Sequence, residues 1–411
     1  MARVRPFVCV RPAPGKEAAI AALPYDVYSR AEAKAAVAAN PDSFLAIDRA
    51  ETSFPDSVDT YAPEVYAKAR DLLRGRIARG DYVREPAPAY FVYSQTMDGR
   101  TQTGVVATVA VDDYVSGAVA RHENTRADKE EDRVRHVGTV GAQTGPIFLA
   151  YRRSAAVDAV VSAATAEDPM CDFTSSDGVR HRVFAVRAAD RVAALTAAFA
   201  AVPRTYIADG HHRAASAVRV GLERRAADPA PTGEKEYDYF LSVLFPDSEL
   251  RIMDYNRVVA DMNGLSPAEL LSAVGKAATV SEPSRGPVRP SAKGEFSMYS
   301  GGEWRLCRFR PEFASADPVD GLDVSLLQNL VLGPVLGIGD PKTDPRIGFV
   351  GGIRGLGELE RRADACGGVA FAMHPTSMAE LFAVADAGRL MPPKSTWFEP
   401  KLRSGLFIHE I

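Results

Sequence analysis

Hydrophobic and polar positions change period several times along the chain, which predicts helices and strands mixed throughout. Residues 61–79 place apolar side chains at helical spacing, which predicts an amphipathic helix. Residues 89–96 and 103–111 alternate like strands, and the Asp98-Gly99 pair between them predicts a hairpin turn. We therefore expect an α+β fold in which mixed sheets are surrounded by helices.

Serine followed three residues later by glutamate predicts helix starts at Ser29, Ser266 and Ser377, because this pattern forms a capping box. A short apolar segment at residues 204–208 predicts a strand that leads into a polar motif. An alanine-rich helix is expected to follow that motif from Ala214.

The length of 411 residues, at roughly 150 residues per domain, predicts two or three domains. Proline, glycine and serine are concentrated in residues 281–293, as in a linker or long turn. We predict an N-terminal α+β region over 1–155, a middle region over 156–280 and a C-terminal α+β region over 281–411.

Composition excludes several classes of protein. The formal net charge of −4 does not favour nucleic acid as a partner. No apolar run is long enough to span a bilayer, and the first residues lack the apolar core of a secretory signal. The four cysteines are scattered without a CxxC pair, which favours a reducing compartment. We therefore expect a cytoplasmic protein without a membrane partner.

The clearest chemical motif is Asp209-Gly210-His211-His212-Arg213, which joins the predicted strand to the predicted helix. Backbone amides at a helix start and a nearby glycine form an anion site, and cationic side chains strengthen it. Adjacent histidines point about 100° apart on a helix, so this pair alone makes an awkward metal site. The alternative is a capped helix start with exposed polar residues.

A second polar segment runs from Arg121 to Arg126. Within it, Glu123 and Asn124 offer oxygen ligands for a hard cation, and the arginines could clamp phosphate. The alternative is a solvated, salt-bridged turn that leads into a charged helix.

A third segment, residues 392–401, begins with a rigid Pro-Pro turn. Lys394, Ser395 and Thr396 could form a clasp for a phosphate or carboxylate of a substrate. The alternative is a tail that packs Trp397 and Phe398 into the core.

The chain resembles the bacterial domain-of-unknown-function family 1015, often described as ParB-like. The resemblance lies in Leu23–Val27, Arg121–Glu123 with Thr125, Ile207–Arg213, Tyr255–Arg257 and Met391–Leu406. The Asp-Gly-His-His-Arg string is also similar to the nucleotide-phosphate motif of the ParB and sulfiredoxin superfamily, which includes free L-serine kinases. This resemblance implies a ParB/sulfiredoxin-like nucleotide-binding unit and a kinase that phosphorylates free L-serine to O-phosphoserine, with Mg²⁺ and ATP or another nucleoside phosphate as donor.

Carried over by position, the resemblance gives Asp209 a role at the metal or the hydroxyl, and Glu123 the role of catalytic base. Both would be Mg²⁺ ligands, although they lie 86 residues apart in the sequence. The phosphate- and nucleotide-binding residues would be Gly210, His211, His212, Arg213 and Arg121. The partners would then be a nucleotide and a small-molecule substrate.

Two other functions fit the same residues. One is a ParB-like regulatory or switch protein that binds a nucleotide without phosphorylating a metabolite. The other is a metal-dependent hydrolase that uses His122, His211 and His212 with Glu123. P-loop, HExxH and GxSxG motifs are absent from the sequence, which lowers the standing of P-loop enzymes, zinc proteases and serine hydrolases.

Overall fold

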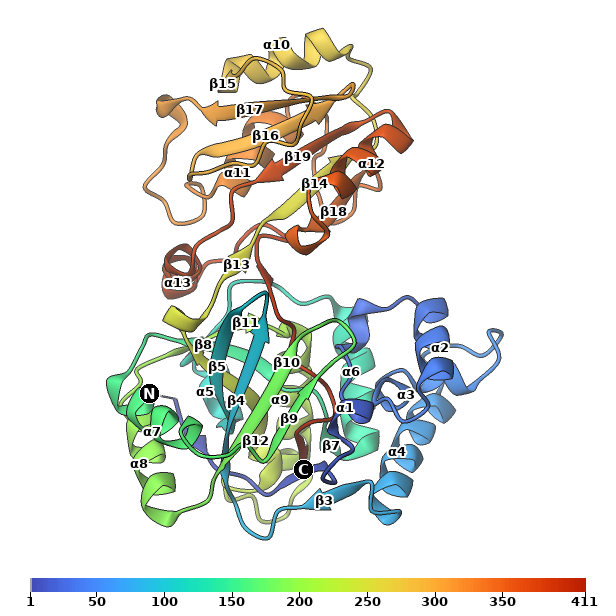
Figure 1. The fold of residues 1–411 in the computed structure, drawn as a ribbon, viewed down its shortest axis with the longest axis vertical. Helices are drawn as coiled ribbons and strands as arrows, with labels where there is room; N and C mark the ends of the chain where they lie inside the picture. The colour runs from blue at the N-terminus through green and yellow to red at the C-terminus, as the bar shows by residue number, and fades with distance from the viewer. Residues whose placement is uncertain (1) are drawn as a thin grey trace. The chain divides into compact units, whose positions relative to one another are not determined.

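The computed structural model describes residues 2–411, which fall into two compact units. The first holds the chain up to Leu250 together with Pro400–Ile411, and the second comprises Arg251–Glu399. Each unit combines helices with β-sheet, which confirms the predicted α+β class (Figure 1). The chain leaves the first unit at Leu250 and re-enters it at Pro400.

A nine-stranded mixed sheet forms the centre of the first unit. Its strands run in the order β6-β11-β8-β12-β5-β4-β10-β9, and β1 pairs with β5 beside this path. The pairs β6–β11 and β8–β12 are parallel and the others are antiparallel. The strands are β1 (Val4–Arg5), β4 (Tyr90–Met97), β5 (Arg100–Ala110), β6 (Val119–Ala120), β8 (Ile147–Tyr151), β9 (Cys171–Thr174), β10 (Arg180–Val186), β11 (Thr205–Asp209) and β12 (Tyr239–Pro246).

A four-stranded sheet, in the order β3-β2-β21-β7, completes the first unit. Its strands are β2 (Cys9–Pro12), β3 (Tyr82–Arg84), β7 (Ala142–Gln143) and β21 (Ile408–Glu410). The helices of the unit are α1 (Glu17–Ile20), α2 (Arg30–Ala39), α3 (Leu45–Asp48), α4 (Pro63–Ala78), α5 (Val111–Val115), α6 (Ala127–Val140), α7 (Ala155–Thr165), α8 (Ala189–Ala200) and α9 (His211–Ala227). Figure 1 shows α2, α3 and α4 grouped at one edge of the unit and α7 with α8 at the other.

Two hydrophobic clusters hold these layers together. The larger one joins the nine-stranded sheet to α7, α8 and α9, with Val157, Phe199 and Val218 contributed by the helices and Phe240 by β12. The smaller one joins the four-stranded sheet to α2, α3 and α4. Burying these apolar side chains is the main force that fixes the sheets against the helices.

The second unit is built on a six-stranded sheet in the order β15-β17-β16-β19-β14-β18, with a two-stranded β13–β20 ribbon. The strands are β13 (Ile252–Met253), β14 (Tyr255–Val259), β15 (Ala278–Val280), β16 (Glu295–Ser300), β17 (Glu303–Phe309), β18 (Ile347–Gly351), β19 (Val369–Met373) and β20 (Trp397–Phe398). The helices are α10 (Pro267–Ala277), α11 (Asp323–Leu327), α12 (Gly357–Cys366) and α13 (Met378–Asp386).

Local sequence signals placed several elements correctly. All three predicted capping boxes form, so that Ser29, Ser266 and Ser377 cap α2, α10 and α13. The predicted hairpin forms between β4 and β5, with positive φ angles of 50° at Asp98 and 76° at Gly99. Both angles suit a type I′ turn, whose twist matches that of the flanking strands.

The domain boundaries differ from the three predicted regions. Residue 155 lies within the first unit, because strands before and after it pair in the nine-stranded sheet. Residue 280 ends β15, which pairs with β17 in the second unit, so residues 281–293 connect two strands of one sheet. Pairing between distant strands, which local composition does not show, sets the boundaries instead.

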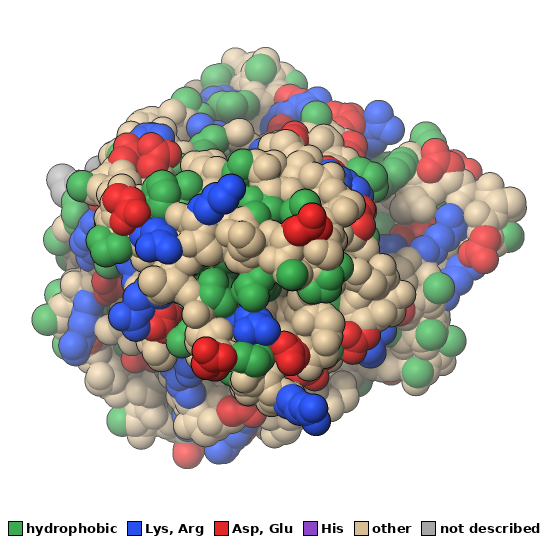
Figure 2. Space-filling view, turned by 90° about the horizontal axis from the view of Figure 1, so that it is seen from above, with side chains coloured by type: hydrophobic (Ala, Val, Ile, Leu, Met, Phe, Trp, Pro, Cys, Tyr) green, Lys and Arg blue, Asp and Glu red, His purple; other side chains and the backbone are tan. Residues whose placement is uncertain are grey.

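The helices described over residues 2–411 include none with the length and apolar character needed to cross a membrane. On the face drawn in Figure 2, acidic and basic side chains are interspersed with hydrophobic ones. That mixture agrees with the near-balanced composition of the chain.

Candidate functional site

The predicted strand–glycine–helix turn is present in the first unit, where Gly210 joins β11 to α9. The pairing of β11 with β8 shifts between Ile207 and Asp209, and Gly210 has a φ of 90°. The helix begins earlier than expected, at His211, and the Ala214 amide donates to the Gly210 carbonyl at 2.9 Å. The first amides of α9 therefore point out of the helix start, as an anion site requires.

Asp209 lies at this turn between two cations. Its carboxylate Oδ2 is 3.3 Å from Lys401 Nζ and 3.7 Å from Arg213 Nη2, and its side chain is 34% exposed. Burial would raise the pKa of Asp209, but Lys401, Arg213 and other neighbours outweigh it and hold that pKa well below its usual range. Asp209 is therefore a carboxylate at neutral pH.

Lys401 is a site residue that the sequence analysis placed in the C-terminal segment without giving it a role. It comes 192 residues after Asp209 and reaches the turn because the chain re-enters the first unit at Pro400. The backbone carbonyl of Lys401 accepts a hydrogen bond from Gln95 Nε2 at 2.9 Å, which anchors the segment on β4. No local pattern would have revealed this long-range contact.

Three potential metal ligands converge beside the turn. The donor atoms of His122, Glu123 and His211 all lie within 4.8 Å of one another, and the two imidazole rings meet edge to face at 4.6 Å between centroids. The convergence follows from the sheet, because β6 runs parallel to β11 and the residues after each strand emerge at the same end. Glu123 and His211 thus meet although they are far apart in the sequence.

Both histidines of this cluster are buried and neutral. Burial lowers the pKa of His122 to about 4, and the pKa of His211 lies well below its ordinary value through burial and the neighbouring His122. His122 also hydrogen-bonds to the backbone of Ile207, which orients its ring. Within residues 2–411, His211 Nε2 is buried and has no hydrogen-bond partner.

The neighbouring histidine of the motif points elsewhere. His212 Nε2 accepts a hydrogen bond from the Arg126 amide at 2.9 Å, which ties the segment before α6 to the start of α9. The expectation that adjacent histidines diverge is therefore met.

Arg121, which was predicted to bind phosphate, lies over the ring of Tyr114, with its guanidinium carbon 5.0 Å from the ring centroid.

A small pocket opens beside Arg213, whose Nη1 donates to the Pro146 carbonyl at 2.8 Å. Arg213 lines this pocket and also pairs with Asp209, so it belongs to both features. The remaining lining residues are Pro24, Tyr25, Asp48, Arg133, His136, Val137, Gln143, Thr144, Gly145, Ile147, Ser216, Ala217, Leu241 and Ser404.

Charged groups of both signs line the pocket. Arg133 lies over the Tyr25 ring at 4.0 Å and pairs with Asp132, while Asp48 accepts from the Thr144 hydroxyl at 3.1 Å. Burial raises the pKa of Tyr25 to about 12 despite the nearby arginines. The pocket can therefore present a neutral phenol, a cation and a carboxylate to a small polar molecule.

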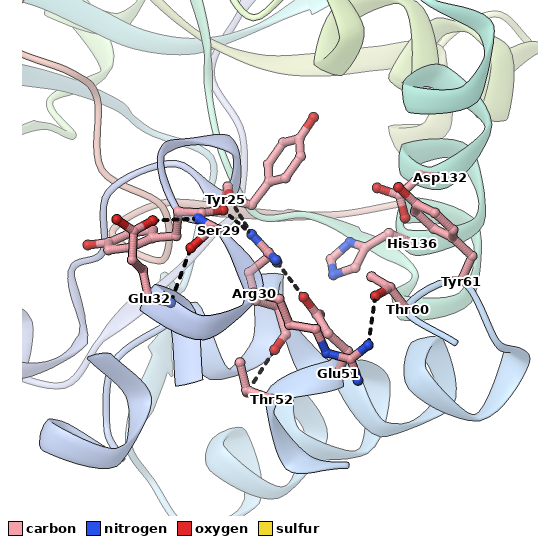
Figure 3. Close-up of polar contacts among 12 residues, drawn as sticks. Tyr25, Ser29, Arg30, Glu32, Glu51, Thr52, Thr60, Tyr61, Asp132 and His136 are labelled. Atoms are coloured by element: carbon pink, nitrogen blue, oxygen red, sulfur yellow. Dashed lines mark hydrogen bonds and ion pairs between the residues drawn. The ribbon is translucent and has the colours of Figure 1, made fainter. Parts of the chain in front are cut away.

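Polar contacts hold the pocket wall formed by the Pro24-Tyr25-Asp26 turn. Arg49 Nη1 donates to the carbonyls of Tyr25 at 3.0 Å and Tyr28 at 2.6 Å, and its Nε pairs with Glu51. Figure 3 shows Tyr25 on its turn, whereas Asp132 and His136 both project from α6. Pro24 and Tyr25 of this turn thus line the pocket.

The predicted substrate clasp belongs to the second unit. Lys394 has a φ of 59° and its Nζ is 5.9 Å from the centroid of the Tyr255 ring. Ser395 is buried, its hydroxyl donates to the Pro392 carbonyl at 2.7 Å, and its own carbonyl accepts from Thr376. Ser395 therefore serves the local turn, and the substrate role of Lys394, Ser395 and Thr396 stays a prediction.

Comparisons with known proteins give the family of the chain. No protein with a curated description matches it. Among solved structures, it is similar to a mutant free serine kinase in complex with AMP (14% identity, 74% of this chain and 92% of that chain, TM-score 0.35). It is also similar to a conserved hypothetical protein from Pyrococcus furiosus (13%, 74% and 94%, 0.32) and to C-terminally truncated SbnI from Staphylococcus aureus (13%, 72% and 82%, 0.36).

The match to a family model covers most of the chain. The sequence profile of the family described as "Protein of unknown function (DUF1015)" matches residues 4–325. This range spans the Arg121–Arg126 segment, the turn at Gly210 and the pocket residues up to Leu241. The chain therefore belongs to the DUF1015 family.

Proposed function

We propose that the protein is a nucleotide- and Mg²⁺-dependent small-molecule kinase, with free L-serine as the first acceptor to test. The observation that supports this most concerns the start of α9. There Asp209 pairs with the cations Lys401 and Arg213. The carboxylate of Glu123 lies beside His211, the first residue of the same helix. Phosphoryl transfer requires mainly positioning and charge stabilisation, and these groups supply both.

The nucleotide phosphates would bind at the start of α9. Outward-pointing amides after Gly210 and the side chains of Arg213 and Lys401 offer donors to phosphate oxygens. His212 and Arg121 remain further candidates for phosphate contacts. Asp209, kept anionic by its cations, would hold Mg²⁺ together with Glu123, because this ion prefers carboxylate and phosphate oxygens. When bound, Mg²⁺ would neutralise the charge on the phosphates.

The acceptor would bind in the pocket that Arg213 shares with the turn. In the reaction, the acceptor hydroxyl oxygen forms a bond to the terminal phosphorus as the bond from that phosphorus to the bridging oxygen breaks. Glu123 accepts the hydroxyl proton, and the nucleoside diphosphate leaves. Arg213 and Lys401 would stabilise the charge that spreads over the transferred group.

The direct test mixes the purified protein with ATP, Mg²⁺ and a panel of amino acids and small alcohols, and follows phosphorus-31 resonances. We expect a phosphorylated acceptor and ADP in equal amounts. The variants Glu123→Gln and Asp209→Asn should each lower the rate about 10²- to 10³-fold. The matched control Glu131→Gln removes an exposed carboxylate on α6 that pairs with Arg135 and Arg219, and should keep the rate.

Two results would contradict the kinase proposal. Tight nucleotide binding without any phosphorylated acceptor would support a switch protein instead. Release of inorganic phosphate at the same rate with and without acceptors would support a hydrolase. Circular dichroism of each variant shows whether a lost rate reflects a lost fold.

A further inference from the structure

The cluster of His122, Glu123 and His211 has more nitrogen donors than a magnesium site uses. Mg²⁺ takes oxygen ligands, whereas imidazole nitrogens favour transition metals such as Zn²⁺, Fe²⁺, Ni²⁺ and Cu²⁺. Two imidazoles and one carboxylate also leave coordination positions open, as catalytic metal sites do. The ligand chemistry of the cluster therefore differs from that of the proposed magnesium site at Asp209.

We propose that His122, Glu123 and His211 form a binding site for one divalent transition metal ion. The inference concerns metal binding alone and stands whether or not the protein transfers a phosphoryl group. The proposed kinase chemistry assigns no role to His122 or His211, and metal binding would give them one.

The geometry of His211 is the first support. Its Nε2 atom is buried and without a hydrogen-bond partner in the described chain, which is costly for a polar group in an apolar setting. The same ring lies within 4.8 Å of donor atoms of His122 and Glu123. A metal ion at this point would take the lone pair of His211.

The orientation of His122 is the second support. The hydrogen bond between its ring and the Ile207 backbone fixes the ring, as backbone carbonyls do for metal-bound histidines. Nitrogen and oxygen donors bound at about 2.0–2.2 Å lie roughly 3–3.5 Å apart, so small side-chain rotations would close the cluster.

Glu123 can serve this site and the kinase chemistry together. A carboxylate that binds a metal through one oxygen keeps the second oxygen for another partner. With the transition metal on one oxygen of Glu123, the other oxygen could still take the acceptor proton. Mg²⁺ would then be held by Asp209 and the nucleotide phosphates.

The test measures metal binding to the full chain. The protein is dialysed against a chelator and titrated with Co²⁺, whose visible absorption reports nitrogen ligation, and then with Zn²⁺ in competition. We expect one Co²⁺ per chain, displaced by equimolar Zn²⁺ but not by millimolar Mg²⁺. The variants His211→Leu and Glu123→Gln should each weaken Co²⁺ binding at least about tenfold.

His212→Leu is the matched control, since it alters the next residue of the same helix and should change Co²⁺ affinity less than about twofold. The site would be disproved by fewer than one ion per chain, by displacement with Mg²⁺, or by equal Co²⁺ affinity in His211→Leu and the unmodified protein. It would also be disproved if His212→Leu weakened binding as much as His211→Leu. If His211→Leu does not fold by circular dichroism, the nearly isosteric Glu123→Gln decides.

Discussion

At the scale of single residues, burial raises the pKa of Asp209, and Lys401 is the neighbour that lowers it most. Replacing Lys401 by methionine removes the ion pair but keeps most of the apolar stem. We expect the proposed kinase rate to fall about 10²-fold and Lys401→Arg to restore part of it. The measurement is the rate of ADP formation with a saturating acceptor.

The matched control for this change is Lys16→Met, which removes an exposed lysine paired with Asp81. Exposed ion pairs contribute little, so this variant should behave like the unmodified protein. Equal rates for Lys401→Met and Lys16→Met would show that Lys401 has no part in the reaction.

How far single residues could be predicted depends on the distance over which they act. The motif at Asp209 was predicted as an anion site because strand, glycine and helix are adjacent in the sequence. The hydrolase alternative grouped His122 and His211 with Glu123 by residue type alone. No local pattern showed that these residues meet, because β6 has only two residues and shows no strand period. Lys401 was missed because its contact depends on where the chain re-enters the first unit.

At the scale of elements, the junction of β11 with α9 depends on the backbone of Gly210. A Cβ added at this position would lie 3.1–3.3 Å from the guanidinium of Arg213, and the φ of 90° is unfavourable for any residue with a side chain. We expect Gly210→Ala to lower the free energy of unfolding by about 1–3 kcal/mol and to displace Arg213. Urea unfolding and nucleotide titration measure the two effects.

Gly233 provides the comparison for this variant. It has a similar φ of 75°, but an added Cβ would meet nothing within 4 Å. Gly233→Ala should therefore lose comparable stability without weakening nucleotide binding. If both variants weakened the binding equally, Arg213 would not be the cause.

Prediction of elements succeeded where the signal is local. The capping boxes and the β4–β5 hairpin depend on residues within four positions of each other, and all of them form. The order of strands in the sheets depends instead on which distant segments bury each other, so the boundaries at 155 and 280 did not coincide with the two units.

At the scale of the whole molecule, buried histidines make stability depend on pH. Burial is the main cause that lowers the pKa values of His122 and His136 to about 4 and that of His181 to about 3. Below about pH 6.5 these histidines take up protons in the unfolded chain but stay neutral in the folded chain. Stability from these groups is therefore fully present above pH 6.5 and is lost as the pH falls toward 4.

We expect the melting temperature to fall between pH 6.5 and pH 4.5, with a slope in free energy of up to about 1.4 kcal/mol per pH unit for each histidine. Asp323 acts in the opposite sense, because burial raises its pKa to about 6 and the folded chain then gains stability on acidification. Thermal unfolding in buffers from pH 8 to pH 4.5 measures the net effect. A melting temperature that stays constant over the acid range would contradict this account.

The late return of the chain to its first unit also bears on synthesis. The turn at Gly210 emerges from the ribosome long before Lys401, the cation that comes 192 positions after Asp209. Strand β21, which pairs with β2 and β7, emerges later still. A growing polypeptide therefore carries the Gly210 turn before Lys401 can pair with Asp209, and the proposed phosphate site gains its full set of charges only once Lys401 has been joined.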